Sequence, residues 1–189
     1  MLDYNHVHTF LSAHGHEATA IHCRQVAEQA RLLAHQFGVD PERAYLAGLL
    51  HDISAVIPTD ERLAQAQAWG VDILPAERAA PMILHQKLSA VMARRDFGVE
   101  DAGVLSAIGC HTTLKPHASR LDKVVFLADK IAWDQPGEPP WLDDLLRALD
   151  DSLDAACLVY LDYLWERRAE LLVVHPWLAA ARANLQQLY

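Results

Sequence analysis

Histidine and aspartate residues that could hold metal ions recur between residues 22 and 129 of this 189-residue chain. The most informative are His51 and Asp52, an adjacent pair at the end of an apolar helical run. Imidazole and carboxylate groups together bind one or two transition-metal ions. Neighbouring residues at a helix end point in different directions, so such a pair can contact two metals at once. Residues of the same types lie before and after the pair, at His22, His85, His111 and Asp129.

Each of these residues also has a purely structural interpretation. A single histidine on an apolar face is more often a core residue than a ligand. An aspartate there needs a partner, because burial of an unpaired carboxylate is costly, and a helix cap or an ion pair would supply one. The order of types, with each residue at the end or on the inner face of a separate helix, favours one shared metal site.

Two of the helices that must position these residues lie at the start of the chain. Apolar residues at helical spacing predict a helix over 17–37 that carries His22 on its buried face. Gly38 is expected to end it. Asp40 is the expected N-cap of a second helix, which begins at Pro41 and runs toward the His-Asp pair.

The next segments alternate between breaks and helices. Residues 53–58 are expected to form a break, followed by a polar helix over 59–69 and a loop over 70–75. Pro81 is expected to open the helix that carries His85.

Two capped helices complete the array. Asp101 is the expected N-cap of a short helix that presents His111 on its apolar stripe. Ser119 and Asp122 resemble a capping box, which would open the helix that carries Asp129.

The whole pattern predicts an all-α helical bundle with a single domain, since no sustained alternation of apolar and polar residues indicates strands. Residues 1–16 are expected to be a solvated leader, although they hold four histidines. Residues 17–135 would form the metal-binding core. Residues 136–189 would add C-terminal helices packed on that core. The segment from Asp134 to Pro140 is expected to form a loop that precedes the first of these helices. These last helices hold Tyr160, Leu164 and Trp165, which the sequence assigns equally well to a homodimer face or to a cover for the core.

The bulk composition limits the partners. The net charge is −9 with no dense Lys/Arg cluster, which argues against a nucleic-acid polymer. A small anionic ligand is compatible with this charge, since metal ions supply positive charge locally. No stretch approaches the roughly 20 apolar residues that span a bilayer, and no secretion signal is recognisable. The three separated cysteines, Cys23, Cys110 and Cys157, indicate core thiols and a cytoplasmic location.

The pattern of His22, His51-Asp52 and Asp129 resembles that of the HD-domain metal-dependent phosphohydrolases, which are all-helical. Within that superfamily the chain is most similar to the YqeK-like symmetrical diadenosine tetraphosphate hydrolases, over about residues 22–131. The segments that carry the resemblance, besides the helix that follows His22, are AGLLHDI (47–53), HQKLSA (85–90), AIGCHTT (107–113) and LDKVVFLADKI (121–131).

The resemblance implies a dinuclear site. One ion would be held by His22, His51, Asp52 and Asp129, and Asp52 would bridge to a second ion held by His85 and His111. Iron is the metal that the resemblance implies, with manganese as a substitute. His51 and Asp52 would form the catalytic centre, where two close cations activate a shared water and stabilise the phosphoryl oxygens.

The resemblance also implies the substrate class, a small phosphorylated molecule and most specifically a nucleotide. Diadenosine tetraphosphate, cleaved to two ADP, is the leading candidate. The expected substrate contacts are Thr112, Lys115, Lys130 and Trp133.

Several positions depart from relatives that cleave this compound. Those relatives tend to carry arginine at the position of Thr19, lysine at that of Ala55, glycine at that of Leu114 and arginine within 133–135. Arginine forks match phosphate well, so an intact metal site with an altered substrate pocket is expected. The cations available to compensate are Arg24, Lys87, Lys115, Lys123 and Lys130.

Two other functions fit the same helical frame. A mixed-valent di-iron centre would catalyse oxygen-dependent cleavage of C–C or C–P bonds. A non-catalytic regulatory protein would bind a nucleotide and retain the metal for stability. Metal analysis and turnover assays distinguish these functions from hydrolysis.

Overall fold

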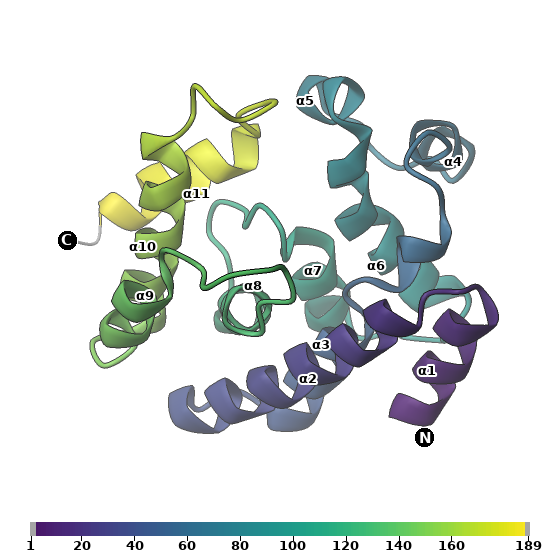
Figure 1. Ribbon diagram of the computed structural model, residues 1–189, viewed down its shortest axis with the longest axis horizontal. Coiled ribbons are helices and arrows are strands. Elements are labelled where there is room, and N and C mark those ends of the chain that lie inside the picture. Colours follow the sequence, from purple (N-terminus) through teal and green to yellow (C-terminus); the bar gives the residue numbers. More distant parts are fainter. Residues whose placement is uncertain (1–2, 188–189) are drawn as a thin grey trace.

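In the computed structural model, which describes residues 3–187, the chain folds into helices, and no strand occurs within that range (Figure 1). The α-helices are α1 (Tyr4–Ala13), α2 (Glu17–Phe37), α3 (Pro41–Leu50), α4 (Arg62–Ala68), α5 (Pro75–Ala79), α6 (His85–Arg95), α7 (Ala102–Cys110), α8 (Arg120–Ile131), α9 (Leu142–Ala148), α10 (Leu153–Glu166) and α11 (Pro176–Gln186). Two 3₁₀ helices, η1 (Ile53–Val56) and η2 (Pro81–Leu84), complete the set. The prediction of an all-α domain is confirmed.

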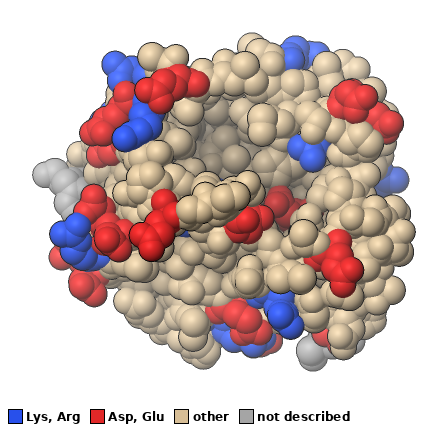
Figure 2. Space-filling view, in the orientation of Figure 1, with Lys and Arg blue, Asp and Glu red and all other residues tan. Residues whose placement is uncertain are grey.

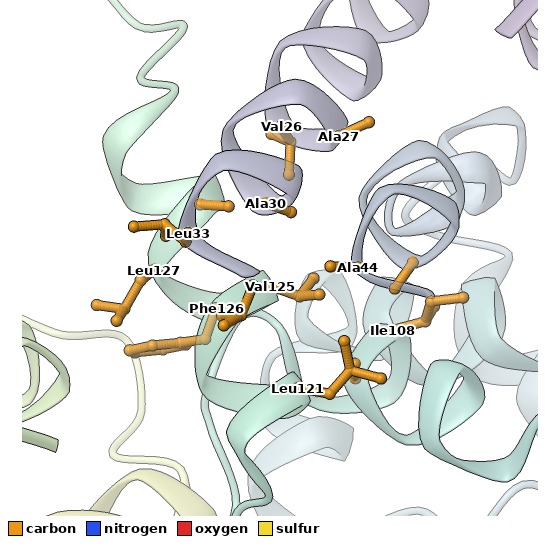
Figure 3. Packing of buried hydrophobic residues seen from close by; sticks show 14 of the residues in the cluster. Val26, Ala27, Ala30, Leu33, Ala44, Ile108, Leu121, Val125, Phe126 and Leu127 are labelled. Atoms are coloured by element: carbon orange, nitrogen blue, oxygen red, sulfur yellow. The ribbon is translucent and has the colours of Figure 1, made fainter. Parts of the chain in front are cut away.

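The long helix α2 is the element on which the centre of the fold packs. It contacts α1, α3 and α8. Its apolar residues, among them Val26, Ala30 and Leu33, lie in the core that Figure 3 shows. The helix α3 comes unusually close, because a Cβ on Gly48 would lie 2.6 Å from the Cα of Ala27. A residue without a side chain is therefore required at position 48.

The predicted helix boundaries near the ligand-type residues are largely confirmed. Gly38 ends α2 with a φ of 64°. The side chains of Asp40 and Asp101 cap α3 and α7 by accepting bonds from backbone N–H groups. Ser119 and Asp122 form the expected capping box at the start of α8. The short polar capping residues, together with Gly38 and Pro41, thus located these helix ends correctly.

The expectation of a solvated N-terminal leader is wrong for the residues that the structure describes. Residues Tyr4–Ala13 form α1, whose first turn is capped by the side chain of Asp3. Val7 and Leu11 lie one turn apart and are fully buried. The many histidines obscured this apolar pair, because i and i+4 residues share one helix face. The boundaries expected at residues 16 and 135 otherwise stay predictions.

The segment from residue 59 to residue 85 differs from expectation in three places. The polar helix begins at Arg62 rather than at residue 59. A short helix, Pro75–Ala79, follows the expected loop. The helix expected from Pro81 is divided into η2 and α6. Proline lacks an N–H group and fits the first turn of a helix, so Pro75 and Pro81 each begin a new short element.

The C-terminal helices pack on α8 through aromatic side chains. Tyr160 of α10 contacts Phe126 of α8, with ring centroids 5.6 Å apart. Trp141 packs against Tyr160 and Tyr163. Tyr160 is thus partly buried against the core within one chain, as are Leu164 and Trp165. The last helix begins at Pro176, where proline occupies the first helical position.

A buried ion network, formed by Glu77, Lys87 and His175, connects the last helix to α5 and α6. Lys87 Nζ donates to Glu77 Oε2 at 2.8 Å, and the backbone N–H of Leu74 donates to the same oxygen at 2.8 Å. His175 Nε2 lies 3.2 Å from Glu77 Oε1. His175 Nδ1 accepts a bond from the Trp177 backbone N–H. Each side-chain oxygen of the fully buried Glu77 therefore has a partner.

The surface carries both signs of charge. On the face shown in Figure 2, acidic and basic side chains are interspersed without a continuous basic area, and the face is hollowed near its middle. Within residues 3–187, no helix has both the length and the apolar character that crossing a membrane requires. The three cysteines are buried and free, as expected for core thiols.

Candidate metal centre

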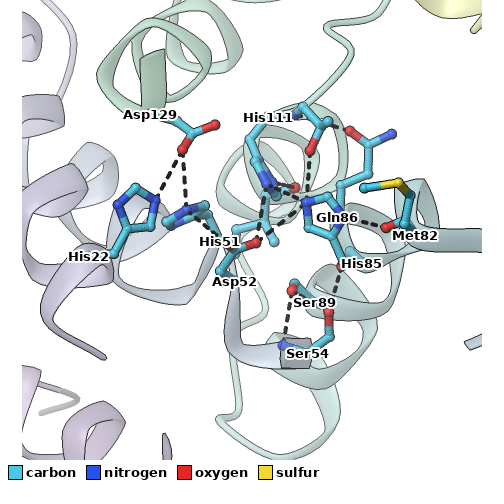
Figure 4. A network of polar contacts seen from close by, with 12 residues as sticks. His22, His51, Asp52, Ser54, Met82, His85, Gln86, Ser89, His111 and Asp129 are labelled. Atoms are coloured by element: carbon cyan, nitrogen blue, oxygen red, sulfur yellow. Dashed lines mark hydrogen bonds and ion pairs between the residues drawn. The ribbon is translucent and has the colours of Figure 1, made fainter. Parts of the chain in front are cut away.

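The six ligand-type residues lie together where five helices meet (Figure 4). His22 projects from the buried face of α2. His51 and His111 are the C-caps of α3 and α7. Asp52 follows His51, His85 begins α6, and Asp129 lies in the last turn of α8. Residues more than 100 positions apart in the sequence thus share one site.

Three of the four histidines are oriented in the same way. In His51, His85 and His111, Nδ1 lies within hydrogen-bond distance of the carbonyl oxygen three residues earlier. These acceptors belong to Gly48, Met82 and Ile108, at 2.8, 2.7 and 2.8 Å. Since a carbonyl oxygen only accepts, Nδ1 carries the hydrogen and Nε2 carries a lone pair. This is the arrangement by which proteins orient metal-binding histidines.

The Nε2 lone pairs converge. His85 Nε2 and His111 Nε2 lie only 3.1 Å apart. Two lone pairs at this distance repel unless a cation lies near both, either a proton or a metal ion. His51 Nε2 is buried and has no hydrogen-bond partner among the described residues. A buried polar atom without a partner is uncommon in folded proteins. These atoms therefore fit a metal site.

The two carboxylates face the same nitrogen atoms. Asp129 Oδ1 lies 3.2 Å from His22 Nε2 and 3.6 Å from His51 Nε2. Asp52 Oδ2 lies 3.5 Å from His51 Nε2. Its other oxygen, Oδ1, lies 3.5 and 3.4 Å from the Nε2 atoms of His85 and His111. Asp52 therefore has one oxygen toward each half of the cluster, as a bridging ligand would.

Two groups of these residues bring their ligand atoms within 4.8 Å of one another. The first is His22, His51 and Asp129, and the second is His51, Asp52 and His111. His85 adjoins the second group through the contacts described above. Imidazole nitrogen with carboxylate oxygen is a donor set that suits first-row metals such as iron, manganese and zinc.

Burial and neighbouring charges put His51, His85 and Asp129 in the forms that bind metal, whereas for His22 the effect of burial is outweighed by Asp129, Asp134 and Asp52, which raise its pKa. Burial lowers the pKa of His51 to about 4, which outweighs the opposite effect of Asp52. Burial also lowers the pKa of His85. Burial alone would raise the pKa of Asp129, but Lys130, His22 and other neighbours hold it well below its usual range. At neutral pH His51 and His85 are thus uncharged and the carboxylate is ionised, as metal coordination requires.

Further polar residues, which the sequence analysis did not single out, support the ligands. Gln86 is buried, and its Oε1 accepts bonds from the Thr112 and Thr113 backbone N–H groups at 3.1 and 3.3 Å. Ser54 Oγ donates to the His85 carbonyl oxygen at 2.8 Å, and Ser89 Oγ donates to Ser54 Oγ at 2.9 Å. The three carbonyl acceptors could have been predicted, because each histidine lies at a helix end, where the carbonyl oxygen three residues earlier is within reach of its ring. Nothing in the sequence pointed to Gln86.

The turn after His111 contains strained backbone. Leu114 has a φ of 52°, in the left-handed region that favours glycine. The resemblance described above predicts a glycine at the position of Leu114. Its side chain is fully buried, so burial offsets the strain.

The four expected substrate contacts fall into two pairs. Thr112 and Lys130 adjoin the centre, with Thr112 Oγ1 2.9 Å from His85 Nε2 and Lys130 Nζ 2.5 Å from Asp129 Oδ2. The other two lie against residues outside the cluster. Lys115 donates to Ser106 and lines a cavity of about 400 Å³. None of the six residues of the metal cluster lines this cavity. Trp133 packs edge-to-face on Trp141. All four roles stay predictions.

Comparisons with known proteins agree with this geometry. A family model described as "HD domain" matches residues 19–134. A Lactococcus lactis subsp. cremoris protein named "Uncharacterized protein in pepC 5'region" is 44% identical over 78% of this chain and 75% of its own length. A Bacillus subtilis (strain 168) protein named bis(5'-nucleosyl)-tetraphosphatase, symmetrical, is 30% identical over 73% of each chain.

A solved structure is similar over the whole fold. It is the crystal structure of a predicted HD superfamily hydrolase involved in NAD metabolism from Clostridium acetobutylicum. The two chains superpose with a TM-score of 0.90, share 27% sequence identity and cover each other completely.

Proposed function

The chain belongs to the HD-domain family, and on this premise we propose that it is a phosphohydrolase with two metal ions that acts on a small nucleotide. The reaction is hydrolysis of a phosphoanhydride or phosphoester bond. The leading substrate is diadenosine tetraphosphate, cleaved symmetrically to two ADP. The names of the Bacillus and Clostridium relatives support a nucleotide as the substrate class.

The observation that carries the proposal is the convergence of four histidine Nε2 atoms on two carboxylates. His22, His51, Asp52 and Asp129 would hold one ion, and Asp52 would bridge to a second ion held by His85 and His111, with iron or manganese as the metal. When bound, two such ions activate water as a nucleophile and stabilise charge on phosphoryl oxygens.

The protein's own groups prepare the site for this reaction. The carbonyl acceptors fix the imidazole rings, so little reorganisation is needed on binding. Lys130 holds Asp129 Oδ2, which leaves Oδ1 directed at His22 and His51. The Thr112 hydroxyl lies 2.9 Å from His85 Nε2 and, with a metal ion on that nitrogen, would donate to a phosphate oxygen at the centre.

A substrate panel tests the proposal. Purified protein would be supplied with Fe(II) or Mn(II) under reducing conditions and assayed with diadenosine tetraphosphate, deoxynucleoside triphosphates, nucleoside diphosphates, sugar phosphates and p-nitrophenyl phosphate. The expected result is metal-dependent ADP formation from diadenosine tetraphosphate. Oxygen consumption without phosphate release would instead indicate an oxygenase. Metal and nucleotide binding without turnover would indicate a regulatory protein.

A further inference from the structure

An arginine lies beside the His85 half of the metal centre. Arg62, the first residue of α4, donates from Nη1 to the Met82 carbonyl oxygen at 2.9 Å and from Nε to the Ile57 carbonyl oxygen at 3.2 Å. The same Met82 oxygen lies 2.7 Å from His85 Nδ1, so the guanidinium and the imidazole meet at one atom. Figure 4 shows Met82 at the end of the network away from His22 and Asp129.

The charge of Arg62 is not neutralised by a carboxylate among residues 3–187, since both of its hydrogen bonds go to neutral carbonyl oxygens. The side chain is half-buried. Burial lowers the pKa of Arg62, and the charge of Asp52 acts in the opposite direction. A guanidinium stays protonated in proteins, so Arg62 adds a positive charge next to the centre.

The cations considered in the sequence analysis differ from Arg62 in this respect. Four of them are paired with carboxylates: Lys87 with Glu77, Lys115 with Asp122, Lys123 with Asp154 and Lys130 with Asp129. Arg24 lies over the Tyr4 ring. A positive charge already paired with a carboxylate attracts phosphate less, which makes Arg62 the better phosphate-binding group.

We infer that Arg62 binds a phosphate group of the substrate next to the one held at the metal centre, on the His85 side. The inference rests on the proposed function. Nη1 of Arg62 uses one N–H for Met82, and Nη2 has no hydrogen-bond partner among the described residues. N–H groups on these two adjacent nitrogens are therefore left for phosphate oxygens, which a guanidinium fork matches. Phosphoanhydrides have a neighbouring phosphate and phosphomonoesters do not. Arg62 therefore favours substrates with two or more consecutive phosphates.

The test compares Arg62→Gln with a matched control, Arg94→Gln, in the metal-loaded protein. Arg94 is exposed in the last turn of α6, at the opposite end from His85. Calorimetric titrations would measure the binding of ADP and AMP, and kinetics would compare diadenosine tetraphosphate with p-nitrophenyl phosphate. We expect Arg62→Gln to weaken ADP binding and raise the KM for diadenosine tetraphosphate by about tenfold or more. AMP binding, metal content and p-nitrophenyl phosphate hydrolysis would stay within about twofold of wild type, as all readouts would for the control.

Arg62 also connects the end of η1 to η2 through its bonds to Ile57 and Met82, so thermal unfolding and a second variant, Arg62→Lys, complete the test. The lysine variant keeps the charge without the fork and is expected to bind ADP with intermediate affinity. Equal loss of ADP and AMP binding, or unchanged ADP binding, would overturn the inference. A wild-type protein that hydrolyses none of the compounds would overturn the proposed function, while the ADP and AMP titrations would still decide the role of Arg62.

Discussion

The molecule contains two buried polar regions, built from histidine and acidic residues, that differ in how their polar atoms are satisfied. In the Glu77–Lys87–His175 network both oxygens of Glu77 have donors. In the metal centre His51 Nε2 has no donor, and two further Nε2 atoms face each other at 3.1 Å. The first region is complete without a ligand.

Histidine tautomers explain the contrast. His175 Nδ1 accepts a bond from a backbone N–H, so its Nε2 carries the hydrogen that faces Glu77. In His51 the roles are reversed, because Nδ1 faces a carbonyl oxygen and Nε2 is left with a lone pair. The backbone group next to Nδ1 therefore decides whether a buried histidine acts as a donor to a carboxylate or as a ligand to a cation.

Removal of the adjacent ligands His51 and Asp52 is expected to have the most severe consequences for the metal centre. The double variant His51→Ala, Asp52→Ala is expected to lose both metals and to reduce turnover at least about a thousandfold, since both halves of the centre depend on this pair. Metal analysis and ADP formation measure the effect. His6→Ala, an exposed histidine next to Asp3, is the control and should keep metal and activity. Undiminished turnover in the double variant would place the reaction at another site.

The complementary mutation is made in the Glu77–Lys87–His175 network. Glu77→Ala leaves Lys87 and His175 without their buried partner, so we expect the free energy of unfolding to fall by about 3 kcal/mol. Metal content per folded protein should not change. Urea unfolding and metal analysis of the same sample check both statements, with Glu61→Ala, an exposed glutamate, as the control. Loss of metal in a folded Glu77→Ala protein would contradict the separation of the two regions.

Removal of the metal with a chelator tests the difference between the two polar regions without a mutation. Metal that binds only the folded state stabilises it by about 2.7 kcal/mol at a concentration 100 times Kd. We expect removal of the metal to lower the melting temperature of the wild type and of Glu77→Ala alike, and to leave that of the His51→Ala, Asp52→Ala protein unchanged. Equal shifts in all three proteins would mean that the metal binds elsewhere.

A weaker effect is expected in the dependence of the free energy of unfolding on pH. Burial would raise the pKa of Glu77, but His175, Lys87 and the Leu74 N–H outweigh it, and the net pKa is lowered. The stabilisation from Glu77 is therefore fully present above the unfolded pKa of about 4.3 and is lost as pH falls through the lower folded value. Unfolding free energies of wild type and Glu77→Gln should converge at acid pH. A difference that grows on acidification would refute the assignment.

The sequence predicted the fold class because the helix ends are set by local chemistry. Asp40 with Pro41, Asp101 and the Ser119–Asp122 box all cap helices as expected. The helix α1 was missed because only two of its residues, Val7 and Leu11, are buried. Such a short apolar pattern is weak evidence until the rest of the core is known.

The candidate site was predicted as a set of residues but not as a set of contacts. The order of His and Asp types located all six residues of the cluster. The partners of Lys87 and Lys123 could not be read from the sequence, because their carboxylates lie on other helices. Arg62 was overlooked for the same reason, since its place beside His85 depends on how the segment after the His-Asp pair folds back.

Gly48 gives the backbone contact between α2 and α3 a wider significance. Its missing side chain sets how near α3 lies to α2, and its carbonyl oxygen orients the His51 ring. The absence of a side chain at residue 48 thus sets the separation of the two helices that position His22 and His51, although the residue offers no ligand atom itself. Protein engineers who wish to retune the separation of these two imidazoles would begin at this position rather than at the histidines.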